Sequence, residues 1–344
     1  MRQILNTLYV MTPNAYLHLD NDTLRIDVER EKKMQVPLHH LGSVVTFGNV
    51  MVSPAAMHRC ADSGIALVLL DHNGRFKARL EGAVSGNILL RQAQHRAAGD
   101  GGFALNVARS VIAGKLRNAR QVLQRGAREA DDADDKKYLN EVAEVLAHSI
   151  RNLHHAPDLD KVRGIEGDAA KAYFSALPKL VRKSAREKFT MDGRSRRPPR
   201  DRFNALISFL YSMVMNDCRS ALESVGLDPQ LGFLHAVRPG RAALALDLME
   251  EFRAMLADRL VLTLINRGQI GAADFQEREG GVVLLDEDAR KIVVVAYQER
   301  KHEEITHPLL GTKVPIGFLP MLQARFMART IRGEMEGYLP FLAK

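Results

Sequence analysis

The stretch Gly82-Ala83-Val84-Ser85-Gly86 divides the sequence into two parts with different hydrophobic patterns. Before it, short apolar runs alternate with turn residues, which is typical of β-strands. After it, apolar residues recur at helical spacing almost to the end of the chain. We therefore predict an α+β protein, with a small β-sandwich-like domain over residues 1–86 and a larger α-helical domain over residues 87–344.

The N-terminal part contains five segments with the composition of short strands. They are residues 7–10, 16–19, 24–28, 34–38 and 65–70. One helix is predicted among them over residues 53–63, because Ser53-Pro54 is a typical helix start and Gly64 a typical stop. No group of residues in this part indicates catalysis.

The C-terminal part begins with two basic amphipathic helices, predicted over residues 88–98 and 106–124. Further helices are predicted to begin near residues 138, 166, 201, 217 and 242. The acidic run 131–137 is interpreted as solvated surface that caps or precedes one of them. One β-hairpin interrupts the helices, with predicted strands over residues 282–285 and 292–296.

Composition limits the class of protein. The net charge of +8 and the pI near 9.5 favour a polyanionic partner. Cys60 and Cys218 are the only cysteines, so a disulfide framework or a cysteine zinc site is excluded and a reducing, cytoplasmic setting is expected. Apolar runs such as residues 65–70 are too short to cross a bilayer, so no membrane association is predicted.

A histidine followed by a helix with two carboxylates is the main candidate for a reactive site. His235 ends the run Gly232-Phe233-Leu234-His235, and Asp247 and Glu250 share one face of a helix predicted over residues 243–260. Glu166, predicted at the start of another helix, could add a further carboxylate. One imidazole with two or three carboxylates suits Mg²⁺ or Mn²⁺ rather than structural zinc. Taken singly, the carboxylate pair would be solvated helix surface and the histidine a core residue.

A basic segment precedes the helix predicted at residue 201. Arg196, Arg197 and Arg200 flank two prolines, and residues 179–188 add five more cations. Such clustering is typical of contacts to phosphates without base recognition. In the helix that follows, Asn204 belongs to a polar stripe, which needs partners if the helix is buried.

In their order and spacing, these motifs resemble the family of CRISPR-associated integrases, the larger and catalytic subunit of spacer-acquisition complexes. The resemblance rests on Pro37-Leu38, residues 44–48, Ser53-Pro54, residues 85–87, Leu90-Arg91, Glu166 with Ala170 and Tyr173-Phe174, residues 197–199 with 204–206, and residues 232–253. The chain departs from the family pattern at Ala236, where glutamate is common, and at Ala254, where proline often stands. Both departures leave the candidate ligands in place and suggest a subgroup such as that of type I-C systems.

The resemblance implies a metal-dependent DNA integrase and endonuclease. Glu166, His235 and Glu250 would bind one Mg²⁺ or Mn²⁺ ion, with Asp247 beside them as a fourth catalytic residue. DNA phosphates would be held by Arg196, Arg197, Arg200, Arg238 and Arg241. Tyr173 and Asn204 would support the site.

The resemblance also implies partners and a reaction. The enzyme would join the 3′-hydroxyl of a double-stranded spacer precursor to a phosphodiester of the repeat, as a homodimer assembled on a small second acquisition subunit. The N-terminal domain would make the dimer and partner contacts. Two alternatives stay open: a metal-dependent endonuclease of DNA repair that cuts without joining, and a DNA-binding scaffold without catalysis.

Overall fold

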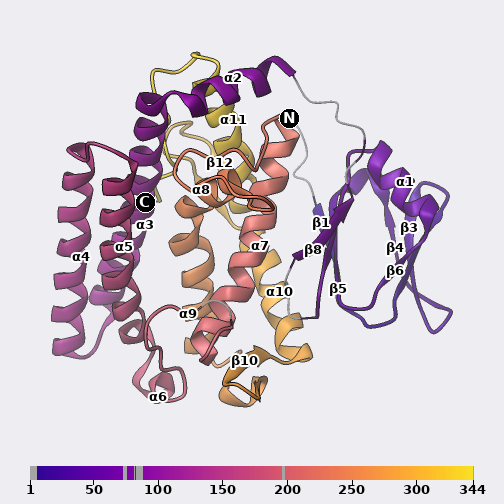
Figure 1. Ribbon diagram of the computed structural model, residues 1–344. Helices are drawn as coiled ribbons and strands as arrows, with labels where there is room; N and C mark the ends of the chain where they lie inside the picture. The colour runs from indigo at the N-terminus through magenta and orange to yellow at the C-terminus, as the bar shows by residue number, and fades with distance from the viewer. Residues whose placement is uncertain (1–5, 73–75, 81, 83–87, 196–197, 344) are drawn as a thin grey trace. The chain divides into compact units, whose positions relative to one another are not determined.

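The computed structural model describes residues 6–72, 76–80, 82, 88–195 and 198–343 (Figure 1). The chain divides into two compact units, residues 1–85 and 86–344. Strands dominate the first unit and helices the second. The predicted α+β fold class, with a β-rich N-terminal unit before a larger helical unit, is therefore confirmed.

The described strands of the first unit form two four-stranded sheets. These strands are β1 (Asn6–Val10), β2 (Tyr16–Asp20), β3 (Thr23–Val28), β4 (Glu31–Pro37), β5 (Leu41–Phe47), β6 (Met51–Val52), β7 (Ala66–Leu70) and β8 (Phe76–Leu80). The sheet orders are β1-β5-β7-β8 and β4-β3-β2-β6. Leu17 and Leu24 of one sheet and Val44 and Leu67 of the other share one buried core, as in a sandwich.

The alternating pattern predicts five of these strands and misses β5, β6 and β8. β5 pairs in parallel with β1 on one side and β7 on the other. Its residues 43–47 are all buried, so they form a continuous run without alternation. The predicted helix is confirmed as α1 (Pro54–Asp62), where the Ser53 side chain accepts a hydrogen bond from the backbone N–H of Ala56.

The second unit is built from helices around one buried helix. The described helices are α2 (Ile88–Gly99), α3 (Gly101–Glu129), α4 (Ala133–His154), α5 (Leu159–Ala176), α6 (Lys183–Arg186), α7 (Arg202–Ser224), α8 (Ala243–Phe252), α9 (Arg259–Asn266), α10 (Glu287–His302) and α11 (Leu319–Ile331). Figure 1 shows α3, α4 and α5 side by side. Every residue of α8 except Leu246 is buried, and α8 packs against both α3 and α7.

Aspartate caps decide where several helices begin. Asp100, Asp132, Asp158, Asp201 and Asp286 each accept backbone N–H groups of the first turn of α3, α4, α5, α7 and α10. The interpretation that the acidic run 131–137 caps or precedes a helix is confirmed, with Asp132 as the cap. The acidic run is not entirely solvated, however, because Asp135 is buried and pairs with Arg186.

Four predicted helix starts are wrong. α4 begins at Ala133 rather than near residue 138, behind its Asp132 cap. Glu166 lies in the interior of α5, because Asp158 starts this helix earlier. No helix begins at residue 217, since α7 runs unbroken from Arg202 to Ser224. The second basic helix begins at Gly101 rather than at residue 106, directly behind its Asp100 cap.

The predicted hairpin is also wrong in its second strand. β10 (Val282–Leu285) pairs with β9 (Phe275–Arg278), which precedes it in the chain. Residues 292–296 belong to α10 instead, because Asp286 accepts from the N–H of Ala289 and starts a helix. A second strand pair, β11 (Glu304–Thr306) with β12 (Lys313–Pro315), was not predicted.

The helix predicted over residues 243–260 is interrupted. α8 ends at Phe252, a π-helical turn spans Arg253–Asp258, and α9 continues to Asn266. A π-helical turn widens the helix and changes the direction of the side chains that follow. Here it adds Arg253 and Asp258, both buried, to the centre of the unit.

Candidate active site

Five side chains from three helices and one loop form what we call the active-site cluster. They are Lys115 of α3, Glu166 of α5, His235 of the loop before α8, and Asp247 and Glu250 of α8. His235 Nδ1 lies 2.6 Å from Asp247 Oδ1, and His235 Nε2 lies 3.8 Å from Glu250 Oε1. Lys115 forms ion pairs with both Glu166 and Glu250. The fold thus brings the four candidate catalytic residues together, with a lysine among them.

Asp247 holds the histidine loop onto α8. Its Oδ2 accepts hydrogen bonds from the backbone N–H groups of Phe233 (2.7 Å) and Leu234 (3.0 Å), and its Oδ1 accepts from that of His235 (3.0 Å). Because an ionised carboxylate only accepts, Nδ1 of His235 is the donor in the contact with Asp247, and in the neutral form of this imidazole Nε2 is the nitrogen with the lone pair. Asp247 therefore orients the imidazole from behind, as carboxylates do for metal-binding histidines.

Gly232 lets the histidine loop approach α8 closely. A Cβ at this position would lie 2.7 Å from the carbonyl carbon of Ala243 and 2.7 Å from Asp247 Oδ2. We predict that Gly232→Ala displaces His235 and lowers the rate of the DNA cleavage expected from the sequence on the order of 100-fold, with a stability loss of about 1–3 kcal/mol. Initial rates and thermal unfolding measure both effects. The control is Gly99→Ala, where nothing lies within 4 Å of the new Cβ. Equal rates in the two variants would contradict the prediction.

Glu250 is a buried carboxylate between two cations. Arg253 Nη2 lies 3.1 Å from its Oε1, and Lys115 Nζ lies 2.8 Å from its Oε2. Burial alone would raise the pKa of Glu250, but the positive charges of Arg253 and Lys115 lower that pKa to about 2. The carboxylate is therefore ionised throughout the physiological pH range and is able to bind a cation.

Lys115 is the member of the active-site cluster that sequence reasoning missed. No local signal marks it, because α3 carries lysine and arginine along much of its length. Its side chain is only 12% exposed, and its ammonium group bridges Glu166 and Glu250. Only the meeting of α3, α5 and α8 in the folded chain distinguishes it.

The donor set of the cluster fits a divalent metal ion. Glu166 and Glu250 share one cation, and Nε2 of His235 lies 3.8 Å from Glu250 Oε1. Glu250 Oε2 is buried and has no hydrogen bond of good geometry, although Lys115 Nζ is close. In the described parts of the chain, no three His, Cys, Asp or Glu side chains are already close enough to hold a metal ion. Glu166, His235 and Glu250 are the residues of the cluster that would hold such an ion.

Tyr173, expected to support the site, belongs to a buried group centred on Asp258. The Tyr173 hydroxyl donates to Asp258 Oδ2 (3.0 Å), and the Tyr211 hydroxyl donates to Asp258 Oδ1 (2.9 Å). The guanidinium groups of Arg253 and Arg194 lie 4.9 Å and 5.4 Å from the centre of the Tyr211 ring. This group connects the π-helical turn next to Glu250 with the basic loop before α7.

Asp258 makes a testable contribution to the pH dependence of stability. Burial raises the pKa of Asp258 from 3.8 to about 6, against the opposing hydrogen bonds from the two tyrosines. The raised pKa therefore adds its full contribution to the free energy of unfolding below about pH 4. As the pH rises to about 6 this contribution is lost, and the free energy of unfolding falls by up to about 3 kcal/mol. We predict that Asp258→Asn removes this decline. Urea unfolding of the wild type and the variant between about pH 4 and pH 7 measures this decline in stability. Parallel pH profiles of the two proteins would contradict the prediction.

Asn204 holds the basic loop in place. Its Oδ1 accepts from Arg194 Nη1 (2.6 Å), and its Nδ2 donates to the carbonyl of Gly193 (2.9 Å) and to Asp201 Oδ2 (2.6 Å). Arg194 also donates to Ser208 Oγ (3.0 Å). The polar stripe of α7 therefore has its partners in this loop.

The structure describes three of the five candidate DNA-binding arginines. Arg196 and Arg197 lie outside the described residues. Arg200 and Arg238 are exposed, and Arg241 is half-buried. Within the described ranges, the side chains of these three arginines form no ion pair. They are therefore available to an external anion.

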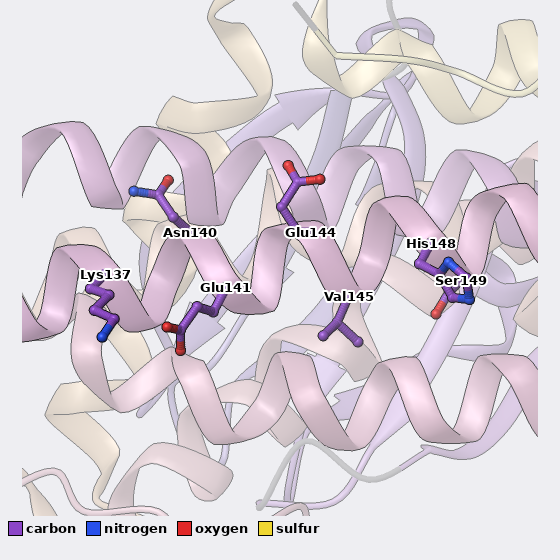
Figure 2. Close-up of a pocket in the computed structure, with 7 residues that line it drawn as sticks. All are labelled: Lys137, Asn140, Glu141, Glu144, Val145, His148 and Ser149. Carbon is purple, nitrogen blue, oxygen red and sulfur yellow. The ribbon is translucent and has the colours of Figure 1, made fainter.

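A surface hollow on α4 is separate from the active-site cluster. Its volume is about 720 Å³, and it is lined by Lys137, Asn140, Glu141, Glu144, Val145, His148 and Ser149. Figure 2 shows these side chains along one helix. It shares no residue with the cluster, so the candidate site does not include it.

Comparison with known proteins identifies the family. The family model for CRISPR associated protein Cas1 matches residues 8–299. CRISPR-associated endonuclease Cas1 1 of Moorella thermoacetica is 56% identical over 342 residues, which cover 99% of each chain. CRISPR-associated endonuclease Cas1 2 of Rhodospirillum rubrum is 49% identical over 348 residues, which cover 100% of each chain. The chain belongs to the Cas1 family.

Solved structures show the same fold at low sequence identity. The Cas1 protein TM1797 of Thermotoga maritima superposes with a TM-score of 0.82 at 22% identity, over 96% of this chain and 97% of that one. A casposase bound to integration product also gives 0.82, at 21% identity, over 97% of this chain and 93% of that one. Among the helices that the structure describes, none combines the length and apolar character needed to cross a membrane.

Proposed function

We propose that this protein is a metal-dependent DNA integrase and endonuclease of CRISPR adaptation. The active-site cluster carries the proposal, because two carboxylates share one cation and an imidazole nitrogen lies 3.8 Å from one of these carboxylates. The relatives named as endonucleases support DNA cutting. The casposase of the same fold is bound to an integration product, which makes strand joining the reaction to test.

The chain's own residues have distinct roles in this proposal. Glu166, His235 and Glu250 would hold one Mg²⁺ or Mn²⁺ ion, and Asp247 would keep the His235 imidazole in the ligating tautomer. The ion, when bound, would act as a Lewis acid on the scissile phosphate and favour loss of the attacking hydroxyl's proton. Lys115 would leave the two carboxylates and become free to contact a phosphate oxygen.

The proposed joining reaction exchanges one phosphodiester bond for another. The 3′-hydroxyl oxygen of the spacer precursor attacks a phosphorus atom at the repeat boundary. The new P–O bond forms as the bond to the leaving 3′-oxygen breaks; the attacking hydroxyl releases its proton and the leaving oxygen takes one up. The number of ester bonds is unchanged, so no nucleotide cofactor is needed. Water in place of the hydroxyl gives cleavage at the same cluster.

The proposed partners are double-stranded DNA, a second copy of the chain and a small second acquisition subunit. The net charge of +8 favours DNA. A Cas6-RT-Cas1–Cas2 complex contains a chain of this fold, with a TM-score of 0.84 over 99% of this chain and 36% of that one. Arg200, Arg238 and Arg241, with Arg196 and Arg197, are the proposed phosphate contacts. The type I-C subgroup, the cytoplasmic setting and the role of the first unit in dimer contacts stay predictions.

A repair-type endonuclease is the second candidate function. The relatives are named endonucleases, which supports the cleavage activity that this function requires. It would use the same active-site cluster, so the products must decide between the two. A scaffold that only binds DNA would neither cut nor join, and its DNA affinity would not change in His235→Ala.

A branched DNA that mimics a half-integrated product tests the proposal. It is incubated with the purified protein and Mn²⁺ or Mg²⁺, first alone and then with the second acquisition subunit. We expect release of the flap together with rejoining of the continuous strand, and neither in His235→Ala. Cutting without rejoining under both conditions would support the repair endonuclease. Binding without either reaction would support the scaffold.

A further inference from the structure

A cleft at the C-terminal end of α3 contains arginines that the active-site cluster does not use. Its volume is about 650 Å³, and its walls come from the end of α3, the start of α4, the segment around α6, and α9. Part of the basic stretch 179–188, which the sequence suggested as a phosphate contact, lines this cleft. It shares no lining residue with the active-site cluster.

Most cations of the cleft are neutralised by its own carboxylates. The ion pairs are Lys179 and Arg186 with Asp135, Lys183 with Asp132, and Arg125 with Glu129. These four cations therefore do not need an external anion, which corrects the simple interpretation of the whole basic stretch as a DNA contact.

Three arginines of the cleft have no such partner. Within the described part of the chain, the side chains of Arg182, Arg259 and Arg267 form no ion pair or hydrogen bond. Asp131, exposed at the junction of α3 and α4, is the one lining carboxylate in these ranges without a partner. Three unpaired positive charges therefore face one unpaired negative charge.

Arg259 is the least exposed of these three arginines. Its side chain is half-buried, and its position between α3 and α10 places it near two other guanidinium groups. Burial lowers the pKa of Arg259, and the positive charges of Arg300 and Arg125 lower it further, while Glu129 and Glu303 offset part of the effect. A half-buried guanidinium among like charges is an unfavourable arrangement that a bound anion would relieve.

We infer that this cleft is a phosphate-binding site, separate from the active-site cluster. The planar fork of an arginine donates two parallel hydrogen bonds to a phosphate group, and three arginines around one cavity provide several such forks. Arg182 precedes α6, whereas Arg259 and Arg267 belong to α9 and its end, so only the folded chain forms the site. The phosphate group belongs either to a DNA backbone or to free inorganic phosphate.

The test uses the full chain in EDTA, so that its outcome does not depend on the proposed metal-dependent chemistry. Thermal unfolding is measured with phosphate and with chloride at equal ionic strength, and binding of a labelled DNA duplex is measured by anisotropy against KCl concentration. The variants are Arg259→Gln and the double variant Arg182→Gln/Arg267→Gln. The double variant changes two exposed side chains, so it tests the site even if Arg259→Gln folds poorly. The control is Arg128→Gln, an exposed arginine of α3 outside the cleft.

We expect phosphate to raise the Tm of the wild type and of the control by roughly 2 °C, and to have no effect on the two cleft variants. If DNA supplies the phosphate, duplex affinity near 0.1 M salt also falls by roughly tenfold, and the salt slope decreases by about one for each arginine removed. Loss of the phosphate effect with control-like DNA binding would assign the cleft to free phosphate. Control-like behaviour in both assays would overturn the inference.

Discussion

The His235→Ala variant is expected to lose nearly all metal-dependent cleavage and joining of DNA while it keeps its fold. In the proposed metal site the imidazole would supply the nitrogen ligand, and its orientation is already set by Asp247. We expect the affinity for Mn²⁺ to fall by at least roughly 100-fold. Asp247 loses one partner but keeps three backbone N–H donors, so the stability should change by only about 1 kcal/mol.

Mn²⁺ titrations followed by electron paramagnetic resonance, together with initial rates on branched DNA, measure this prediction. His155→Ala is the matched control, because His155 is exposed at the end of α4 and lies outside the active-site cluster. Near-normal turnover or unchanged Mn²⁺ affinity in His235→Ala would remove the imidazole from the proposed ligand set.

Glu250→Ala is expected to have the largest effect on stability within the active-site cluster. It removes the carboxylate that Lys115 and Arg253 both contact, and their side chains are only 12% and 11% exposed. Lys115 keeps its ion pair with Glu166, whereas Arg253 loses its ion-pair partner. An unpaired buried charge of this kind costs about 3–5 kcal/mol. This variant therefore tests catalysis poorly, unlike His235→Ala, because lost activity would be mixed with lost stability.

A double variant separates the charge effect from the loss of packing. Denaturant unfolding at neutral pH is compared for the wild type, Glu250→Ala, Lys115→Met and Glu250→Ala/Lys115→Met. We expect the double variant to be more stable than Glu250→Ala, because it no longer contains a buried ammonium group that has lost one of its two carboxylates. Additive losses would show that the Lys115–Glu250 ion pair has little energetic weight.

The local sequence pattern was sufficient to predict the fold class and much of the candidate site. The short alternating runs predict β1 to β4 and β7, and helices begin at Ser53-Pro54 and near residue 201 as expected. The spacing of Asp247 and Glu250 places both on α8 near His235. These features depend on neighbours in the sequence, so they can be predicted without knowledge of the tertiary fold.

Features that depend on distant parts of the chain could not be predicted. Lys115 becomes part of the site only when α3 packs against α5 and α8. The tyrosine contacts of Asp258 need the π-helical turn, for which the sequence has no clear signal. Residues 292–295 are β-branched and apolar, which favours a strand locally, but the cap at Asp286 places them in α10.

The same limit applies to charge. In the sequence, all cations between residues 179 and 188 are equivalent candidates for DNA contact. In the folded chain, Asp132 and Asp135 neutralise three of them, Lys179, Lys183 and Arg186, whereas Arg182 joins two arginines from α9 and its end. Which charges remain available to a ligand is thus a property of the tertiary structure.

A crystal structure of the protein with Mn²⁺, with anomalous scattering recorded at the manganese edge, tests the central claim most directly. We predict one strong peak in the active-site cluster, contacted by Glu166, His235 Nε2 and Glu250, with the ammonium group of Lys115 moved away from both carboxylates. Lys115 still bridging Glu166 and Glu250 at saturating Mn²⁺, with no manganese peak between them and His235, would contradict the account.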